Sequence, residues 1–298
     1  MTPTPLEEVQ LAGRRVLLKR EDTHELGSFK WRGALPTLEA YKHRGVDTVI
    51  TASTGNHGAA TAWAAERLGM KAVVFASEGA SHTKVDRMRS LGADVRLVGA
   101  DFDQAKDEAE RFAADAGVLF VDGLEREQYD GYAVIADEIL QQAGEPPSAV
   151  VVPVGNGALF GGIGLGICRN RPEVERVGVV AKQAPCMLLS WEAGEPVECE
   201  SASTFADGIA VRVAVPMAVE VVGEIASRML QVSDREIARA VGAYDEVGIR
   251  AEGAAAAALA AGPQLDHLDD PLVLIVTGRN IDDDLFRRAV EAPDSFPD

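Results

Sequence analysis

Short apolar runs alternate along the chain with longer stretches of helical character. Four brief runs in the first half, lying close to Gly or Asp residues, predict strands at 46–51, 72–76, 94–98 and 118–121. Stretches that carry Ala, Glu, Arg and Lys at helical spacing predict helices between them, at 59–68, 83–91 and 102–116. This part of the chain therefore predicts a compact block of alternating strands and helices.

The rest of the chain repeats the alternation. It predicts strands at 149–154, 177–180 and 272–277, and helices at 132–142, from Leu159 onward, at 234–245 and at 253–261. Strands that alternate with helices of this length indicate parallel sheets covered on both faces. We predict an α/β fold with two open, twisted, mostly parallel sheets flanked by helices. A larger domain would comprise residues 1–45 and 125–298, with a smaller βαβ domain, 46–124, inserted into it.

Composition narrows the function classes. The chain of 298 residues has 29 Lys and Arg against 47 Asp and Glu, for a formal net charge of −18. An acidic surface repels phosphate backbones and anionic lipids, so we expect neither a nucleic-acid nor a membrane partner. We find no apolar run of membrane-spanning length and no secretion leader.

The three cysteines, Cys168, Cys186 and Cys199, are too few and too irregularly spaced to predict a disulfide framework or a metal site. This cysteine usage is typical of a reducing compartment, so we expect a cytoplasmic protein without a metal ion.

One candidate ligand-binding turn is the segment 153–159, Pro-Val-Gly-Asn-Gly-Ala-Leu. In parallel sheets ligands bind where a strand turns into the next helix. Gly155 and Gly157 allow the backbone to approach a ligand, and the helix N-terminus favours an anion such as a phosphate. The alternative is a glycine-rich turn that permits tight packing of helix on sheet. The segment lacks the Lys-Ser/Thr ending of a nucleotide P-loop.

A second candidate turn is the segment 51–58, Thr-Ala-Ser-Thr-Gly-Asn-His-Gly. Ser53, Thr54, Asn56 and the backbone N–H groups would form a nest that suits a carboxylate. The alternative is an ordinary helix cap by Ser53 or Thr54. A run with both Asn and His has more polar groups than capping requires, which favours the binding interpretation.

The third candidate is Lys30, which lies between Phe29 and Trp31. Apolar surroundings favour the neutral amine, the form that attacks an aldehyde to give an imine. A phosphate cradle, a carboxylate nest and such a lysine together fit pyridoxal 5′-phosphate and an amino-acid substrate.

These segments resemble the motifs of the fold-type-II pyridoxal-phosphate enzymes, the group of serine/threonine dehydratases, serine racemase, threonine synthase and cysteine synthase. Residues 19–33 resemble the family's KRED…GSFK-RGA signature, and 51–58 resemble its S-x-G-N-H/T loop. The Gly155–Leu159 segment stands where the family has a tetraglycine loop, 204–212 resemble a further segment, and 277–280 resemble S/T-G-x-N. The matches follow the family's order over nearly the whole chain. They imply a tryptophan-synthase-β-like fold whose larger domain binds the cofactor.

The resemblance implies roles for individual residues. Lys30 would form the imine and move the proton at the substrate α-carbon, with Ser53 and Thr54 beside it as catalytic residues. Asn56 would lie at the cofactor's 3′-oxygen, Gly208 against the cofactor by its backbone, and Thr277 at the pyridine nitrogen. The phosphate would be held by N–H groups of Gly155, Asn156, Gly157, Ala158 and Leu159. The substrate carboxylate would be surrounded by Ser53, Thr54, Gly55, Asn56 and His57.

Some positions differ from the family pattern. Asn156 and Ala158 replace glycines, Gly123 replaces the usual Asn, and Gly131-Tyr-Ala-Val134 replaces G-Q-G-T before a helix. Glu252 begins a segment that resembles the family's E-x-x-G/A-A near the cofactor, although a glutamate at a helix N-terminus also stabilises the helix dipole.

The resemblance also implies a reaction. A hydroxyl at the pyridine nitrogen makes the ring a weaker electron sink than a carboxylate would, which favours loss of a β-substituent. We therefore expect a dehydratase, or ammonia-lyase, that converts a small β-hydroxy amino acid such as serine or threonine into a 2-oxo acid and ammonia, and a homodimer. The alternatives are a β- or γ-replacement enzyme of the threonine- or cysteine-synthase type, an amino-acid racemase, and a non-catalytic binding protein on the same fold.

Overall fold

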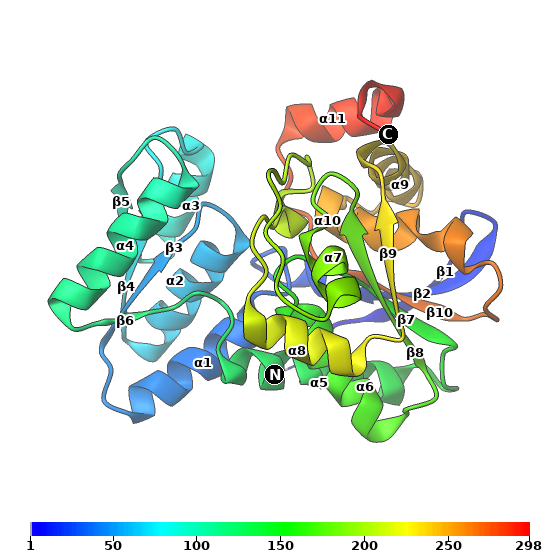
Figure 1. Ribbon diagram of the computed structural model, residues 1–298, viewed down its shortest axis with the longest axis horizontal. Helices are drawn as coiled ribbons and strands as arrows, with labels where there is room; N and C mark the ends of the chain where they lie inside the picture. The colour runs from blue at the N-terminus through cyan, green and yellow to red at the C-terminus, as the bar shows by residue number, and fades with distance from the viewer. Residues whose placement is uncertain (1) are drawn as a thin grey trace. The chain divides into compact units, whose positions relative to one another are not determined.

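The computed structural model describes residues 2–298, which form two compact units (Figure 1). The larger unit comprises the chain up to Ser28 together with Tyr132–Asp298, and the smaller unit comprises Phe29–Gly131. The smaller unit is therefore inserted into the sequence of the larger one. The first boundary falls just before Lys30 rather than at residue 45, because helix α1 (Trp31–His43) packs on helix α2 (Asn56–Leu68). The Trp31 and Trp63 rings meet edge to face at this contact, with centroids 6.4 Å apart.

The smaller unit contains a four-stranded parallel sheet in the order β5-β4-β3-β6. The strands are β3 (Thr48–Ala52), β4 (Lys71–Ala76), β5 (Asp94–Leu97) and β6 (Leu119–Phe120). Helices α2, α3 (His82–Ser90) and α4 (Phe102–Ala116) connect them, so the predicted elements are confirmed. Helix α4 buries alanines at helical spacing against the sheet, and Asp101 caps its N-terminus by accepting a hydrogen bond from the Gln104 N–H.

The larger unit contains a six-stranded sheet in the order β1-β2-β10-β7-β8-β9. The strands are β1 (Leu6–Leu11), β2 (Arg14–Arg20), β7 (Ala149–Pro153), β8 (Glu175–Ala181), β9 (Arg228–Val232) and β10 (Leu272–Val276). Only β1 and β2 pair in the antiparallel direction. Strands β7 and β10 are buried along their whole length, as expected at the centre of a parallel sheet.

Helices cover both faces of this six-stranded sheet. They are α5 (Arg126–Gln142), α6 (Ala158–Asn170), α7 (Cys186–Ala193), α8 (Pro216–Ile225), α9 (Asp234–Glu246), α10 (Gly253–Ala260) and α11 (Asp283–Glu291). In Figure 1, α9 and α10 lie above the strands of the larger unit, and α6 and α8 lie below them. The alanines of α10 are buried against β7, β8 and β10, which allows close packing of helix on sheet.

These observations confirm the predicted α/β fold with two mostly parallel sheets. The hydrophobic pattern did not predict β1, β2, α1, α7, α8, β9 or α11. Helix α5 begins at Arg126, before the predicted start at residue 132, so the Gly131–Val134 segment lies inside a helix. A side chain at Gly131 would lie only 2.0 Å from the Arg32 carbonyl oxygen, so this glycine permits close packing of backbones.

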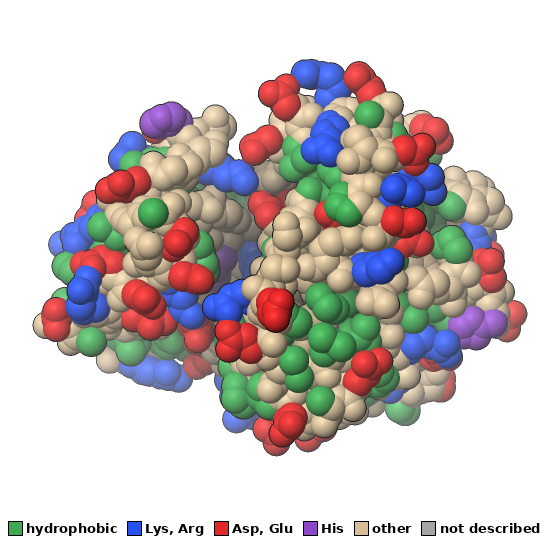
Figure 2. Space-filling model, turned by 45° about the horizontal axis from the view of Figure 1, so that its top comes forward, with side chains coloured by type: hydrophobic (Ala, Val, Ile, Leu, Met, Phe, Trp, Pro, Cys, Tyr) green, Lys and Arg blue, Asp and Glu red, His purple; other side chains and the backbone are tan. Residues whose placement is uncertain are grey.

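Figure 2 shows acidic and basic side chains interspersed over the visible face, without a continuous basic stripe there. Among the described residues, no helix has the length and apolarity needed to cross a bilayer.

Candidate active site

The turns after β2, β7 and β10 lie at one edge of the larger unit's sheet. These strands are parallel neighbours, with Leu272 paired with both Val16 and Ala149, so their carboxyl ends point the same way. The Gly155–Leu159 loop follows β7, and Thr277 follows β10. Two segments that are far apart in sequence, both predicted to bind the cofactor, therefore emerge at the edge where parallel sheets bind ligands.

The β7–α6 loop lies close to neighbouring backbone and adopts a conformation that requires glycine. Gly157 has a φ of +90°, in the left-handed region. A Cβ at Gly155 would lie 2.9 Å from the carbonyl oxygen of Gly208, so this loop meets the 207–209 segment with no room for a side chain. The loop thus brings Gly155 and Gly208 together.

The side chain of Asn156 is hydrogen-bonded to one of the backbone N–H groups predicted to bind the phosphate. Its Oδ1 accepts a hydrogen bond from the Ala158 N–H at 3.2 Å. The first N–H groups of a helix have no partner within the helix, and here an Asn side chain satisfies one of them. Asn156 therefore satisfies the N–H of the first residue of α6, and a phosphate would have to displace its Oδ1 to reach the Ala158 N–H.

Substitution of Gly157 by alanine is expected to weaken cofactor binding by about tenfold, because the left-handed conformation disfavours a side chain by roughly 1–2 kcal/mol. The new Cβ would also meet Met187 Cε and Val222 Cγ2 at 3.3 Å. The measurement is a titration of apo-protein with pyridoxal 5′-phosphate. Gly223→Ala in α8 is the matched control, since nothing lies within 4 Å of its Cβ. Equal affinities of the two variants would contradict the role given to the loop.

Two buried hydroxyl groups lack hydrogen-bond partners among the described residues. They belong to Thr277, which directly follows β10, and to Ser28. Thr277 is 2% exposed and Ser28 is 1% exposed, and neither Oγ has a partner. Ser28 forms an isolated antiparallel bridge with Gly278, so both hydroxyls belong to the same small region. Buried hydroxyls are normally paired, so unpaired ones indicate a place where a ligand supplies the partner. Ser28 was not predicted, although it lies within the GSFK motif.

Glu252 is a buried carboxylate that joins this region. It is 3% exposed, its Oε2 accepts a hydrogen bond from the Asn280 N–H at 3.2 Å, and its own N–H donates to the Gly278 carbonyl. A Cβ at Gly278 would lie 2.6 Å from Glu252 Oε1, so that glycine makes room for the carboxylate. Glu252 therefore holds the 278–280 turn that follows Thr277, a role beyond stabilising the α10 dipole.

The charged residues of the KRED motif form structural ion pairs. The Lys19 ammonium, fully buried, donates to Glu138 Oε2 at 2.6 Å, to Gln142 Oε1 at 2.9 Å and to the Thr4 carbonyl at 2.8 Å. Arg20 donates two hydrogen bonds of 2.8 Å to the Asp22 carboxylate. The motif therefore fixes the end of β2, from which the chain leads to Ser28.

In the smaller unit, Lys30 immediately precedes helix α1. Its Nζ lies 5.0 Å from the centroid of the ring of Phe29, one of the two aromatic residues beside it in the sequence. Its backbone carbonyl accepts the first hydrogen bonds of α1, from the N–H groups of Gly33 and Ala34. The backbone of Lys30 is thus fixed by a helix start, while its side chain remains partly exposed.

The 53–57 segment forms a tight turn between β3 and α2. The Ser53 Oγ accepts a hydrogen bond from the Gly55 N–H at 3.2 Å, and α2 begins at Asn56. A Cβ at Gly58 would lie 2.8 Å from the Ser53 carbonyl oxygen, so this glycine lets the turn fold against the helix. Ser53 therefore shapes the turn, and α2 directs its N-terminal N–H groups toward it, as an anion site requires.

The imidazole of His57 packs against the backbone of residues 121–123. Its Nε2 lies 3.3 Å from the Val121 carbonyl oxygen, and a Cβ at Gly123 would lie 3.2 Å from its Cε1. Gly123, which replaces the family's usual Asn, therefore makes room for the ring. Burial, together with the positive charge of Lys30, lowers the pKa of His57 to about 4, so the ring is neutral at pH 7.

The pKa of His57 predicts a pH-dependent stability. The folded protein disfavours the protonated ring, so the unfolded chain binds more protons between pH 6.5 and about 4. Stability is therefore retained above pH 6.5 and lost as the pH falls through this window, by about 2–3 kcal/mol for this group. His57→Gln should remove that part of the pH dependence in urea unfolding measured from pH 7 to pH 4.5. The exposed His43→Gln is the control, and a wild-type slope in His57→Gln would contradict the assignment.

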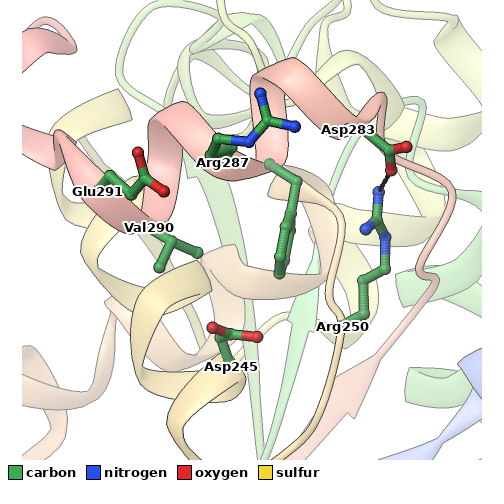
Figure 3. A pocket seen from close by; sticks show the side chains of 7 residues that line it. Asp245, Arg250, Asp283, Arg287, Val290 and Glu291 are labelled. Atoms are coloured by element: carbon green, nitrogen blue, oxygen red, sulfur yellow. Dashed lines mark hydrogen bonds and ion pairs between the residues drawn. The ribbon is translucent and has the colours of Figure 1, made fainter.

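A pocket of about 260 Å³ lies beside α9 and α11 of the larger unit (Figure 3). Arg250 lies at its wall and pairs with Asp283 at 2.7 Å, while Arg287 pairs with Asp284 at 3.0 Å. Both arginines that line it are thus paired within the protein, and none of the predicted site residues lines it.

The residues of the larger unit fit pyridoxal 5′-phosphate. The helix N-terminus behind the Gly155–Leu159 loop suits a phosphate, and the buried Thr277 hydroxyl lacks the partner that a ring nitrogen could supply.

Comparison with known proteins identifies the class. Residues 1–278 match the family model of pyridoxal-phosphate dependent enzymes. This chain belongs to that family, and the predicted family, fold and cofactor are confirmed.

The similarity extends to particular relatives. The chain is 33% identical over 288 residues to an L-threonine ammonia-lyase of Thermotoga maritima, which covers 94% of this chain and 71% of that protein. It is 35% identical over 218 residues to the biosynthetic L-threonine dehydratase of Escherichia coli, covering 70% of this chain and 42% of that protein. The processed form of threonine deaminase isoform 2 from Solanum lycopersicum superposes with a TM-score of 0.92 at 30% identity, covering 97% of this chain and 83% of that one. The predicted class of enzyme, a pyridoxal-phosphate-dependent lyase, agrees with these relatives.

Proposed function

We propose that this protein is an ammonia-lyase that removes water from a small β-hydroxy amino acid, serine or threonine, to give a 2-oxo acid and ammonia. The observation that carries the proposal is the buried Thr277 hydroxyl, which has no partner among the described residues. A neutral hydroxyl, in place of a carboxylate, at the ring nitrogen favours loss of the β-hydroxyl over prolonged storage of negative charge. The 33% identity to an L-threonine ammonia-lyase over 94% of the chain supports the same reaction.

When bound, pyridoxal 5′-phosphate supplies an aldehyde that condenses with amines and a ring that withdraws electrons from the substrate α-carbon. We assign the phosphate to the N–H groups of Gly155, Asn156, Gly157, Ala158 and Leu159. The backbone of Gly208 would lie against the cofactor, and Asn56 would donate to its 3′-oxygen. Thr277 would donate to, or accept from, the ring nitrogen according to the protonation of that nitrogen.

The protein's own groups would then handle the substrate. Lys30 Nζ would bind the cofactor covalently in the resting enzyme and take the proton from the α-carbon once it is released. Ser53, Thr54, Gly55 and Asn56 would hold the α-carboxylate through hydroxyl and N–H groups at the start of α2. His57 would contribute its backbone N–H, since its ring faces the Val121 carbonyl.

The test is an assay of the purified, cofactor-loaded protein with the L- and D-forms of serine and threonine. We expect a yellow protein that forms a 2-oxo acid and ammonia in equal amounts from one of them. A coloured protein that forms no 2-oxo acid from any of the four would overturn the lyase proposal. Product only after addition of sulfide or a phosphorylated homoserine would favour the replacement alternative, and a change of handedness in recovered substrate would favour a racemase.

We further propose that the enzyme acts as a homodimer in the cytoplasm. The absence of a membrane-crossing helix among the described residues is compatible with this location. Sedimentation of the loaded enzyme tests the dimer, and a monomer at micromolar concentration would contradict it.

A further inference from the structure

Two of the three cysteines come into contact in the larger unit, although they are not neighbours in sequence. Cys186 is the first residue of α7 and is fully buried. Its Sγ lies 2.9 Å from the Val197 carbonyl oxygen and 3.2 Å from that of Arg212. The Cys199 N–H donates to the same Arg212 carbonyl at 2.8 Å. A single carbonyl oxygen therefore contacts both cysteines.

The fold holds this arrangement in place. Helix α7 ends at Gly194, and the chain then turns back to form an isolated bridge between Glu198 and Val213. Ser190 Oγ accepts a hydrogen bond from the Val197 N–H at 2.9 Å, which ties the returning segment to α7. Cys186 and Cys199 thus close a loop whose ends are already held together by hydrogen bonds.

The two thiols differ in their surroundings. Burial, and then the neighbouring Cys199 thiol to which it is hydrogen-bonded, raise the pKa of Cys186 to about 11. Cys186 is therefore protonated at neutral pH and inaccessible to solvent. Cys199 is partly exposed, so a reagent from solvent meets it first.

We propose that Cys186 and Cys199 form a thiol pair that small-molecule disulfides modify and convert into an intramolecular disulfide. In the first step the Cys199 thiolate attacks one sulfur of the small disulfide, and one small thiolate leaves. In the second step Cys186 loses its proton and attacks the Cys199 sulfur, which releases the second small thiolate. Two protein thiols are oxidised, and one small disulfide is reduced to two thiols.

The charges around Cys199 indicate which disulfides react. Glu198 and Glu200 flank it on both sides and are exposed, and Arg212 pairs with Glu198. The residues that flank Cys199 in the sequence therefore make its surroundings acidic, and the whole chain is net negative. A cationic disulfide should react several-fold faster than an anionic one at low salt.

The experiment uses the cofactor-loaded Cys168→Ser protein, in which only the two thiols of the pair remain. With cystamine, a cationic disulfide, we expect both thiols to disappear and peptide mapping to show Cys186 linked to Cys199. The unfolding temperature should rise by a few degrees, because a cross-link restricts the unfolded chain. Oxidised glutathione, which is anionic, should give the same product several-fold more slowly.

Two further variants, made in the same background, separate the steps. Cys186→Ser retains a hydroxyl that can donate to the Val197 carbonyl and should stop at a mixed disulfide on Cys199. Cys199→Ser should leave Cys186 unmodified, because that thiol is buried. A final product with cysteamine on Cys199 and a free Cys186 in the Cys168→Ser protein would overturn the proposal, as would modification of Cys186 in Cys199→Ser at the rate seen for the pair.

Discussion

Replacement of Lys30 by alanine is expected to abolish covalent attachment of the cofactor and to lower kcat by roughly 10³- to 10⁴-fold. The proposed function gives Lys30 two tasks, binding the aldehyde and moving the α-proton. The 53–58 turn contains no lysine that could take over either of them. The position of Lys30 at the start of α1 fixes its backbone, so the alanine variant should fold. Absorbance of the bound cofactor and the rate of 2-oxo acid release measure the two losses separately.

Lys42→Ala is the matched control, since this exposed lysine lies in the last turn of the same helix. It should retain wild-type colour and rate. Borohydride treatment of the wild-type protein, followed by peptide mapping, should place the reduced cofactor on Lys30. Attachment to another lysine, or a Lys30→Ala protein with full activity, would show that the amine has been assigned wrongly.

Replacement of Lys19 by methionine is expected to lower the free energy of unfolding by about 3–5 kcal/mol. Lys19 is fully buried and Glu138 nearly so, and their 2.6 Å ion pair lies among hydrogen bonds to Thr4 and Gln142. Loss of the ammonium removes the positive charge and the hydrogen bond that Lys19 gives to the buried Glu138 carboxylate. Urea unfolding of the cofactor-loaded protein should show a midpoint lower by roughly 1 M or more.

Two variants make this prediction specific to the buried pair. Arg15→Met removes a partly exposed cation from the same strand, β2, and should change the unfolding free energy by less than about 1 kcal/mol. Lys19→Met combined with Glu138→Leu removes both charges and should recover much of the loss. If the double variant is less stable than Lys19→Met, the buried charge is not the cause.

The motifs predicted most of the candidate site, because the turns at 53–57 and 155–159 each lie between a strand and a helix that are close in sequence. Local sequence was therefore sufficient to predict the turns at 53–57 and 155–159, and the strand that leads to Thr277. It was insufficient for α1 and the hairpin of β1 and β2. The hairpin turn depends on positive φ angles at Ala12 and Gly13, and α1 contains Pro36, so neither has an unambiguous periodic pattern.

Other features were not predicted for two reasons: one side chain differs from the family motif, and several contacts join residues that are distant in sequence. The hydrogen bond from the Ala158 N–H to Asn156 Oδ1 is local, but a family motif that has glycine at position 156 does not predict it. The neutral state of His57 depends on burial of its ring and on the charge of Lys30, neither of which the turn at 53–57 contains. The contact of Cys186 with Cys199 depends on a bridge between Glu198 and Val213, and cysteine spacing alone did not predict it.

The sequence by itself determined the alternation of strands and helices, the family and the cofactor, because these depend on periodicity and on motifs contained in short segments. The tertiary structure decided which buried groups have partners: it paired Lys19 with Glu138, directed Glu252 to the 278–280 turn and left the Thr277 hydroxyl without a partner within residues 2–298. Burial and pairing are properties of the surroundings that the whole fold creates, and the same residue in the same local sequence has a different charge and reactivity when those surroundings change.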